Sequence, residues 1–430
     1  MNKRKGKPYW LVIDSYVHIS VKNNDVLYYN TYSGKVLEFL ARTNGDIILK
    51  LTRRLLKPEN HRVIRISPKE LENPVISDFL RLIREYFMGD LVEAGLSNAR
   101  PFQAAPPRAK IHFDVKKVRN EPDLSPGKEL MSYIFEITIY LNDSCNQQCR
   151  ECTNFFKQAM WCRKETPRPG KPGGNNLDIS ILENLIRDIK ACQLNSLNFT
   201  GGDVSLYPHL DELHQVLESV NFKIRFFFHY LNVGERLKSL EQLKKHNFDI
   251  RLLAHFPLEI DQFKKAMEFL SGCGLNVQPV IFLQSDEEFS LLEGLLREFP
   301  LESPVLLPYY NMNNLDFFKN NFFVNREDIE ARKPGQRLID GNGTINMDNF
   351  GKMTILANGK VYANVMDPAL GILGKDTIYD CVYRELIKGW SWFRVRKNVL
   401  PCKMCNYNLL CPPLSNYNRV IGCNDLCTIR

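Results

Sequence analysis

The sequence predicts an α/β protein whose central part is built around a parallel sheet. Three observations predict this class. Six apolar, strand-like runs alternate with amphipathic segments between Tyr133 and Tyr310. A smaller unit of strand-like runs and a helical pattern precedes them, and most of the 12 cysteines gather after the first run or near the end of the chain. Six βα repeats predict a parallel sheet, either doubly wound or curled as an incomplete (β/α)6 barrel.

The composition is typical of a folded globular protein. At 430 residues the chain is longer than one core usually serves, so two or three domains are expected. The net charge of +8 is scattered and argues only weakly for nucleic acid; it indicates a solvated basic surface, or an acidic peptide or other anionic partner. The apolar stretch behind the basic start is short and broken by Asp14, and no run is long enough to cross a bilayer, so a cytoplasmic location is expected.

The first hundred residues predict a small α+β domain. Strand-like runs cover 9–14, 17–22 and 26–31, and a helix follows over 74–87 before a glycine ends it. We expect one face of this helix to carry the apolar side chains of Val75, Phe79, Leu82, Ile83, Tyr86 and Phe87. The proline-rich stretch that follows predicts a linker. The expected domains are therefore 1–100, a linker at 101–128, a core at 129–310 and a cysteine-rich domain at 311–430.

The core and the tail follow in order. Strands are expected over 133–141, 194–200, 223–230, 249–256, 275–282 and 303–310, with helices over 179–190 and 263–270. Beyond residue 311 a hairpin turns at Asn358-Gly359 and a helix covers 378–387. In a parallel sheet of either kind, chemistry takes place at the carboxyl ends of the strands.

Three cysteines stand at the end of the first core strand. Cys145, Cys149 and Cys152 form the pattern C-x3-C-x2-C, which chance would place in this chain with odds of about one in a hundred. Thiolates bind zinc or iron, and three of them leave one iron of a cubane cluster with an open coordination site. A closed zinc site with Cys162 as its fourth ligand is the alternative.

A glycine pair stands at the end of the second core strand, in L-N-F-T-G-G-D. Gly201 and Gly202 allow backbone groups to approach a ligand closely, and Asp203 could accept hydrogen bonds from an ammonium group. Alone, this tripeptide indicates a turn. One strand after the three cysteines, it becomes more specific.

This combination resembles the radical S-adenosylmethionine (SAM) superfamily, in which C-x3-C-x2-C holds a [4Fe-4S] cluster and G-G-E/D binds the methionine end of SAM. The resemblance implies a partial (β/α)6 radical-SAM barrel. It implies as cluster ligands Cys145, Cys149 and Cys152, and as SAM contacts Gly201, Gly202 and Asp203.

The tail resembles the SPASM region of peptide-modifying radical SAM enzymes, which holds auxiliary iron–sulfur clusters. Its cysteines are Cys402, Cys405 and Cys411, spaced C-x2-C-x5-C, and Cys423 and Cys427, spaced C-x3-C. The family usually has cysteine at the positions of Asn364 and Ser415. We therefore expect one auxiliary cluster, on the first three cysteines and either Cys423 or Cys427; a zinc ribbon is the alternative. Two further departures are Glu151 inside the first motif and a fourth strand that lacks the family's serine-rich cofactor contact.

The N-terminal unit resembles, by pattern alone, the small winged-helix-like domain with which peptide maturases grip a precursor leader, by pairing with an edge strand. The resemblances together imply an enzyme that abstracts hydrogen from a ribosomally made peptide and forms a thioether or carbon–carbon cross-link. Flavodoxin or ferredoxin would be the electron donor, and a second maturase is a further expected partner. The alternative is a binding protein that presents the precursor to another maturase without cleaving SAM.

Overall fold

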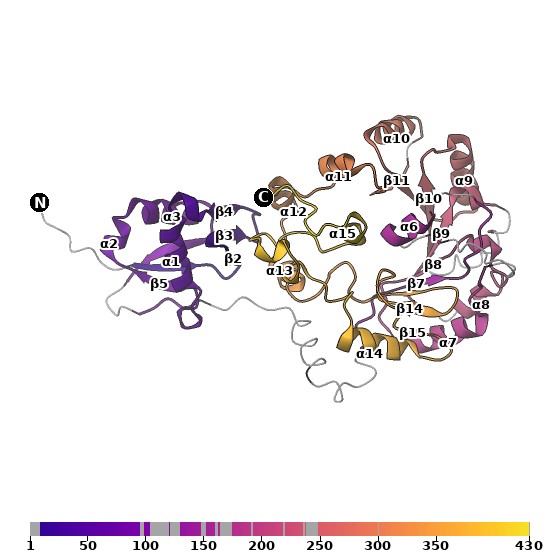
Figure 1. The fold of residues 1–430 in the computed structure, drawn as a ribbon, viewed down its shortest axis with the longest axis horizontal. Helices are drawn as coiled ribbons and strands as arrows, with labels where there is room; N and C mark the ends of the chain where they lie inside the picture. The colour runs from indigo at the N-terminus through magenta and orange to yellow at the C-terminus, as the bar shows by residue number, and fades with distance from the viewer. Residues whose placement is uncertain are drawn as a thin grey trace, which may run out of the picture.

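The computed structural model describes residues 9–94, 99–103, 120, 130–147, 152–159, 162–163, 174–190, 192–217, 220–234, 237, 248–299 and 301–429. Figure 1 shows a small N-terminal unit beside a larger body that is built on one long sheet. Most of the predicted linker 101–128 lies outside the described residues. No helix in the described ranges is both long and apolar enough to cross a membrane.

The N-terminal unit contains two three-stranded antiparallel sheets, with strand orders β2-β3-β4 and β5-β1-β6. The three predicted strands are confirmed as β1 to β3. The strands are β1 (Tyr9–Ile13), β2 (Val17–Lys22), β3 (Asp25–Asn30), β4 (Val36–Phe39), β5 (Val63–Ile66) and β6 (Gly89–Glu93), and the helices are α1 (Asp46–Leu55), α2 (Pro68–Leu71) and α3 (Pro74–Glu85). Apolar side chains from both sheets, α1 and α3 form one core.

The prediction for the last helix of this unit was wrong at its end. Helix α3 stops at Glu85, and Phe87 lies beyond it with φ of 53° and a side chain that is 76% exposed. Phe87 therefore does not join the apolar face, which buries Ile76, Phe79, Leu80 and Ile83. Hydrogen bonds from the Tyr16 hydroxyl and the Asn30 amide to the Phe87 carbonyl hold this turn.

The six predicted core strands are confirmed, and all six run parallel in the order in which they occur in the sequence. They are β7 (Glu136–Tyr140), β8 (Ser196–Thr200), β9 (Lys223–His229), β10 (Phe248–His255), β11 (Val277–Leu283) and β12 (Val305–Pro308). The order never reverses, as it would in a doubly wound sheet. Because right-handed crossovers that all step in one direction leave their helices on one side of the sheet, this arrangement is that of a curled, one-sided α/β sheet.

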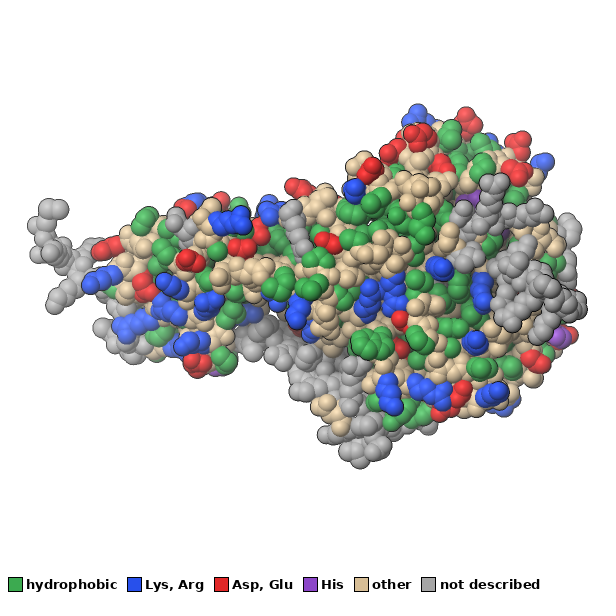
Figure 2. Space-filling model, in the orientation of Figure 1, with side chains coloured by type: hydrophobic (Ala, Val, Ile, Leu, Met, Phe, Trp, Pro, Cys, Tyr) green, Lys and Arg blue, Asp and Glu red, His purple; other side chains and the backbone are tan. Residues whose placement is uncertain are grey.

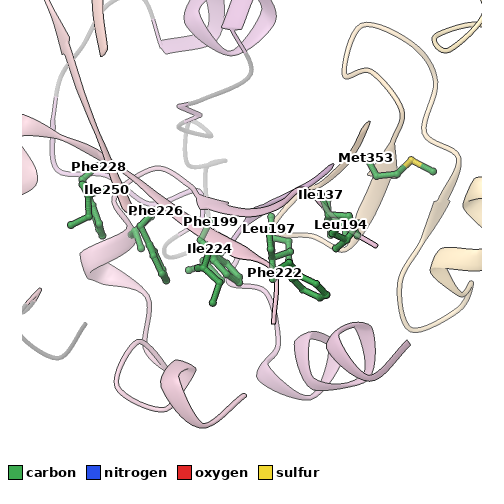
Figure 3. Packing of buried hydrophobic residues seen from close by; sticks show 14 of the residues in the cluster. Ile137, Leu194, Leu197, Phe199, Phe222, Ile224, Phe226, Phe228, Ile250 and Met353 are labelled. Carbon is green, nitrogen blue, oxygen red and sulfur yellow. The ribbon is translucent and has the colours of Figure 1, made fainter. Parts of the chain in front are cut away.

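The helices of the core are α6 (Cys152–Ala159), α7 (Ile179–Ile189), α8 (Leu213–Leu217), α9 (Ile260–Gly272) and α10 (Asp286–Glu298). Side chains of alternate strand residues point from the sheet toward the helices, as Figure 3 shows for Leu197, Phe199 and Phe226. The residues between them face the opposite side of the sheet. That second face carries the candidate site.

Local sequence explains where several helices begin. Asp178 accepts a hydrogen bond from the Ser180 amide at the start of α7, and Ser285 accepts one from the Glu288 amide at the start of α10. Both side chains satisfy amides that have no partner inside the helix. The acidic first turn of α10 also suits the positive end of the helix dipole.

The C-terminal segment extends the core sheet. Strand β13 (Lys352–Ile355) pairs parallel to β7, and β14 (Lys360–Tyr362) and β15 (Gly371–Ile372) follow it antiparallel, so the sheet has nine strands. The predicted hairpin is confirmed, with Gly359 at φ of 77°. The sheet thus continues past the predicted 129–310 segment. The remaining helices are α11 (Leu315–Asn321), α12 (Arg326–Arg332), α13 (Gln336–Asn342), α14 (Ile378–Lys388), which confirms the last predicted helix, and α15 (Asn416–Ile421).

The cysteine-rich tail packs against the N-terminal unit, as Figure 1 shows for the end of the chain. Leu27 and Tyr29 of β3 share an apolar cluster with Tyr407 and Cys411. The Ser20 hydroxyl donates to the Asn406 side chain at 2.8 Å across the same contact. The N-terminal unit is therefore anchored to the region that holds the tail cysteines.

Candidate functional site

The loop after β7 carries the first cysteine motif. Cys145 lies in this loop, and Cys152 is the first residue of α6 and is buried. Cys149 and Glu151 lie outside the described residues. The Cys145 sulfur accepts hydrogen bonds from the Gln147 amide at 3.4 Å and the Asn232 side chain at 3.9 Å, and Asn232 follows β9.

The glycine pair after β8 permits a close approach, as predicted, but its partner here is the cysteine loop. A Cβ atom on Gly202 would lie 2.3 Å from the Ser144 carbonyl oxygen, and one on Gly201 would lie 2.7 Å from the Asn142 carbonyl oxygen. Neither position has room for a side chain. The two glycines therefore allow the loop that carries Cys145 to lie directly on the end of β8.

Hydrogen bonds fix this contact. The Gly202 amide donates to the Asn142 carbonyl at 3.1 Å, and the Asp203 amide donates to the Ser144 carbonyl at 2.6 Å. The Asn142 side chain donates in return to the Asp203 carbonyl at 2.7 Å. The structure thus brings Cys145 next to the G-G-D turn, as expected for carboxyl ends of neighbouring parallel strands.

The Asp203 carboxylate is buried and has a structural contact. It accepts hydrogen bonds from the Ser205 amide at 3.0 Å and the Ser205 hydroxyl at 2.7 Å, and so caps the short helical turn Val204–Leu206. Its contact with an ammonium group stays a prediction.

Helix α6, which positions Cys152, is held at its far end. The Gln158 side chain donates to the Tyr310 carbonyl at 2.7 Å and accepts from the Tyr310 amide at 2.8 Å, just beyond β12. The Asn416 side chain at the start of α15 donates to the Lys157 carbonyl at 2.9 Å, and Figure 1 shows α6 and α15 beside each other. The helix therefore bridges the last core strand and the C-terminal segment.

Two histidines that sequence reasoning missed belong to this site. His229 and His255 end the adjacent strands β9 and β10, and their ring centroids are 5.1 Å apart. Phe155 of α6 stacks on His255 at 5.4 Å. The only signal available was that both strand runs, R-F-F-F-H and L-L-A-H, end in histidine. Burial and, to a smaller extent, the neighbouring His255 together lower the pKa of His229 to about 3. The His229 ring is therefore neutral at pH 7.

A small apolar cavity joins these histidines to two cysteines. Its lining consists of Cys152, Phe155, Cys162, His229, Leu253, Ala254, His255 and Phe282. Cys162 comes next to Gly201 through a parallel backbone bridge. Within the described ranges, however, no three His, Cys, Asp or Glu side chains are grouped as ligands of a single metal ion would be. The zinc alternatives therefore gain no support from the described cysteines.

The tail cysteines lie in two environments. Cys402 and Cys411 are buried, and Cys405 and Cys427 pack in the same apolar cluster as Cys411. Burial raises the pKa of the Cys411 thiol to about 12, and the thiols of Cys405, Cys427 and Cys402 act in the same direction. The Cys423 sulfur instead lies 2.9 Å from a carboxylate oxygen of Asp425 and donates to it.

An amide side chain, Asn364, and a hydroxyl side chain, Ser415, occupy the two positions where the resemblance would place further cysteines. Asn364 is buried and donates to the Asn416 side chain at 2.6 Å and to the Asn349 side chain at 3.4 Å. Ser415 forms the N-cap of α15 with Asn418. Both positions therefore take part in hydrogen bonds within the C-terminal segment.

Basic side chains gather at the centre of the face shown in Figure 2, between α6, α15 and the β14–β15 hairpin. Arg419 forms a bidentate ion pair with Asp367 at 2.8 and 2.9 Å. Burial and the charge of Arg419 lower the pKa of Arg394, so the two guanidinium groups are close neighbours. The Arg163 guanidinium lies over the Phe156 ring at 5.3 Å.

Comparison with known proteins gives structural similarities only. No family model matches the chain, and no curated protein is significantly similar to it. Solved structures are similar to it. Streptococcus suis SuiB bound to precursor peptide SuiA is 14% identical with a TM-score of 0.47, over 98% of each chain. SuiB bound to S-adenosylmethionine is 13% identical with a TM-score of 0.48, over 97% of this chain and 100% of that one. The protein anSMEcpe with bound AdoMet is 16% identical with a TM-score of 0.44, over 65% of this chain and 84% of that one.

Proposed function

We propose that this chain is a radical SAM enzyme that modifies a ribosomally synthesised precursor peptide. The contact between the Cys145 loop and the Gly201-Gly202-Asp203 turn carries the proposal. It places the cysteine loop and the glycine turn side by side at the carboxyl ends of two parallel strands, where α/β enzymes place their chemistry. When bound there, a [4Fe-4S] cluster with SAM supplies one-electron chemistry that removes a hydrogen atom from an unactivated carbon.

The residues have separate tasks in this proposal. Cys145, Cys149 and Cys152 hold the cluster, because thiolates are the ligands that iron–sulfur clusters take. Gly201, Gly202 and Asp203 contact SAM. The donor set fits this chemistry, and the cavity beside it contains a buried His229 Nε2 atom with no hydrogen-bond partner in the described structure. A polar atom so placed can face a ligand without first losing a protein contact.

The protein's own contribution is to orient the substrate and to exclude water. Phe155 and Phe282 line the cavity, and the Phe155 ring centroid lies 4.7 Å from that of Phe282 and 4.4 Å from that of Tyr309. The peptide approaches the basic face shown in Figure 2, whose charges suit an acidic segment or a carboxylate. The product is a cross-link, either thioether or carbon–carbon.

The N-terminal unit would bind the precursor. Strand β6 forms one edge of its sheet and is largely exposed, so an extended peptide can pair with it. One auxiliary cluster would occupy the tail cysteines, and flavodoxin or ferredoxin would supply electrons, with a second maturase as a further partner. The alternative role, a partner that presents the peptide without cleaving SAM, is not favoured by any contact at the site.

Anaerobic reconstitution with iron and sulfide tests the proposal. We expect the loaded protein to form 5′-deoxyadenosine from SAM under strong reductant, and Cys149→Ala to abolish this product. Cys273→Ala is the matched control, because Cys273 packs against the main core away from both motifs. Absence of 5′-deoxyadenosine from the fully loaded wild-type protein would refute the enzyme proposal and favour the alternative role, in which the protein only presents the peptide.

A further inference from the structure

Arg396 is a buried cation in the middle of the cysteine-rich tail. Its guanidinium donates to the Pro412 carbonyl at 2.5 Å, the Asn424 carbonyl at 2.7 Å and the Pro413 carbonyl at 3.5 Å. Its Nη1 atom also donates to the Cys402 sulfur at 3.4 Å. The side chain is fixed by these bonds, and one of its donors points at a thiol.

No carboxylate forms an ion pair with Arg396 in the described structure, although burial of an unpaired charge is costly. The residue is only 7% exposed, so water does little to compensate. Asp348 lies close enough for the charge of Arg396 to act on it, but burial raises the pKa of Asp348 and so favours its neutral form. The charge of Arg396 therefore needs an anion that the carboxylates around it do not provide.

The thiols around Arg396 can provide that anion. Cys402 contacts it directly, and Arg396 and Cys411 line the same small cavity. Cys405 and Cys427 pack with Cys411 in one apolar cluster. Four thiolates that hold an iron–sulfur cluster carry a net negative charge.

The chain path separates Cys427 from Cys423. A backbone bridge to Val324 fixes the segment of Cys427, with the Thr428 amide donating to the Val324 carbonyl at 3.0 Å. Cys423 follows the end of α15 at Gly422, and its sulfur is engaged by Asp425. Cys427 is thus held beside Cys411 and Cys405, whereas Cys423 is already hydrogen-bonded to a carboxylate.

We propose that Cys402, Cys405, Cys411 and Cys427 hold the auxiliary iron–sulfur cluster, that Cys423 is not a ligand, and that Arg396 is the built-in counter-charge of the cluster. Arg396 acts as a positioning and tuning residue, because charge and hydrogen bonds at the sulfurs set the reduction potential of such clusters. The inference rests on the iron–sulfur part of the proposed function. It does not depend on SAM cleavage.

The ligand assignment is tested in a chain whose first motif is removed by Cys145→Ala, Cys149→Ala and Cys152→Ala, so that iron bound after anaerobic reconstitution reports the auxiliary site alone. Adding Cys427→Ala should abolish the iron and sulfide that this chain retains, and adding Cys423→Ala should leave both unchanged. Loss of iron with Cys423→Ala, or full retention with Cys427→Ala, would overturn the assignment. Because SAM plays no part in this measurement, failure of SAM cleavage and failure of this inference are separate results.

The role of Arg396 is tested by the midpoint potential of the auxiliary cluster in the same background, followed by electron paramagnetic resonance during reductive titration. Arg396→Gln removes the charge and should shift the midpoint to more negative potential, with a changed resonance line shape. Arg396→Lys keeps the charge but loses the bond to Cys402, so a smaller shift in the same direction is expected. Arg384→Gln, which removes an arginine of α14 that is hydrogen-bonded to Asp376 and to the Leu370 carbonyl, is the control and should leave the midpoint nearly unchanged.

An unchanged midpoint in Arg396→Gln would refute the counter-charge role. If Arg396→Gln fails to fold, the lysine variant decides: a midpoint equal to that of the wild type refutes the role, and a partial negative shift supports it.

Discussion

Gly202→Ala tests whether the contact between the cysteine loop and the G-G-D turn holds the candidate site together. The new Cβ atom would lie 2.3 Å from the Ser144 carbonyl oxygen and 2.7 Å from the Ser144 carbonyl carbon, where ordinary contacts begin at 3.4 Å. Both atoms belong to the backbone and cannot rotate away. The loop must therefore withdraw by about 1 Å, which is the difference between those distances.

This withdrawal has two costs that can be estimated. Overpacking of a close contact costs about 1–3 kcal/mol. The loop shift also stretches the Gly202–Asn142 and Asp203–Ser144 backbone hydrogen bonds, and each is worth about 0.5–1.5 kcal/mol. We expect a total loss of about 2–6 kcal/mol in the free energy of unfolding, together with poorer iron loading, because Cys145 moves with the loop.

Urea unfolding and iron content after reconstitution measure the two effects. Gly294→Ala is the matched control: it lies inside α10, and no atom is found within 4 Å of the Cβ position. Alanine at that site should stabilise the helix by about 0.5–1 kcal/mol. If Gly202→Ala unfolds at the same urea concentration as the wild type and binds the same iron, the contact does not determine the geometry of the site.

Three further substitutions follow from the packing and charges. Phe155→Ala should lower the free energy of unfolding by about 3–5 kcal/mol in urea titrations, since the ring fills the site cavity against Tyr309 at 4.4 Å. Gln158→Leu should cost about 2–4 kcal/mol in the same assay, because both polar backbone groups of Tyr310 lose their partner, whereas replacing the exposed neighbour Lys157 with alanine should cost almost nothing. His18 has its pKa lowered to about 4 by burial and by Arg62, so its contribution to stability is complete above about pH 6.5 and is lost as the pH falls toward 4. Between about pH 7 and pH 5 the free energy of unfolding of the wild type should therefore fall by about 2 kcal/mol more than that of His18→Gln. Parallel pH profiles of the two proteins would contradict this.

The six core strands and β1 to β3 could be predicted from the sequence because each is a short run of β-branched and aromatic residues, whereas β4 to β6 were not predicted. The βα repeats predicted that the core strands run parallel, but they left open whether the strand order reverses, as it would in a doubly wound sheet. The end of α3 could not be predicted, since Phe87 continues the apolar period of the helix but turns outward at φ of 53°. That turn depends on hydrogen bonds from Tyr16 and Asn30, which come from distant parts of the chain.

The candidate site was predictable where it depends on spacing and not where it depends on packing. The sequence places Gly202 near Cys145 because adjacent parallel strands end together, but the partner of the glycine, the Ser144 carbonyl, emerges only from the path of the loop. His229 and His255 come together through the register of β9 and β10, in which Leu253 pairs with His229. A one-residue slip would turn one ring to the other face of the sheet.

The network around Asn364 shows how the C-terminal segment can act on the first motif without a second auxiliary cluster. Asn364 bonds to Asn416, and Asn416 bonds to the Lys157 carbonyl of α6, the helix that begins with Cys152. The path is continuous, buried and made of neutral amides. Neutral amides can transmit position but hold no electron at an accessible potential. The tail can therefore fix where Cys152 lies through this network.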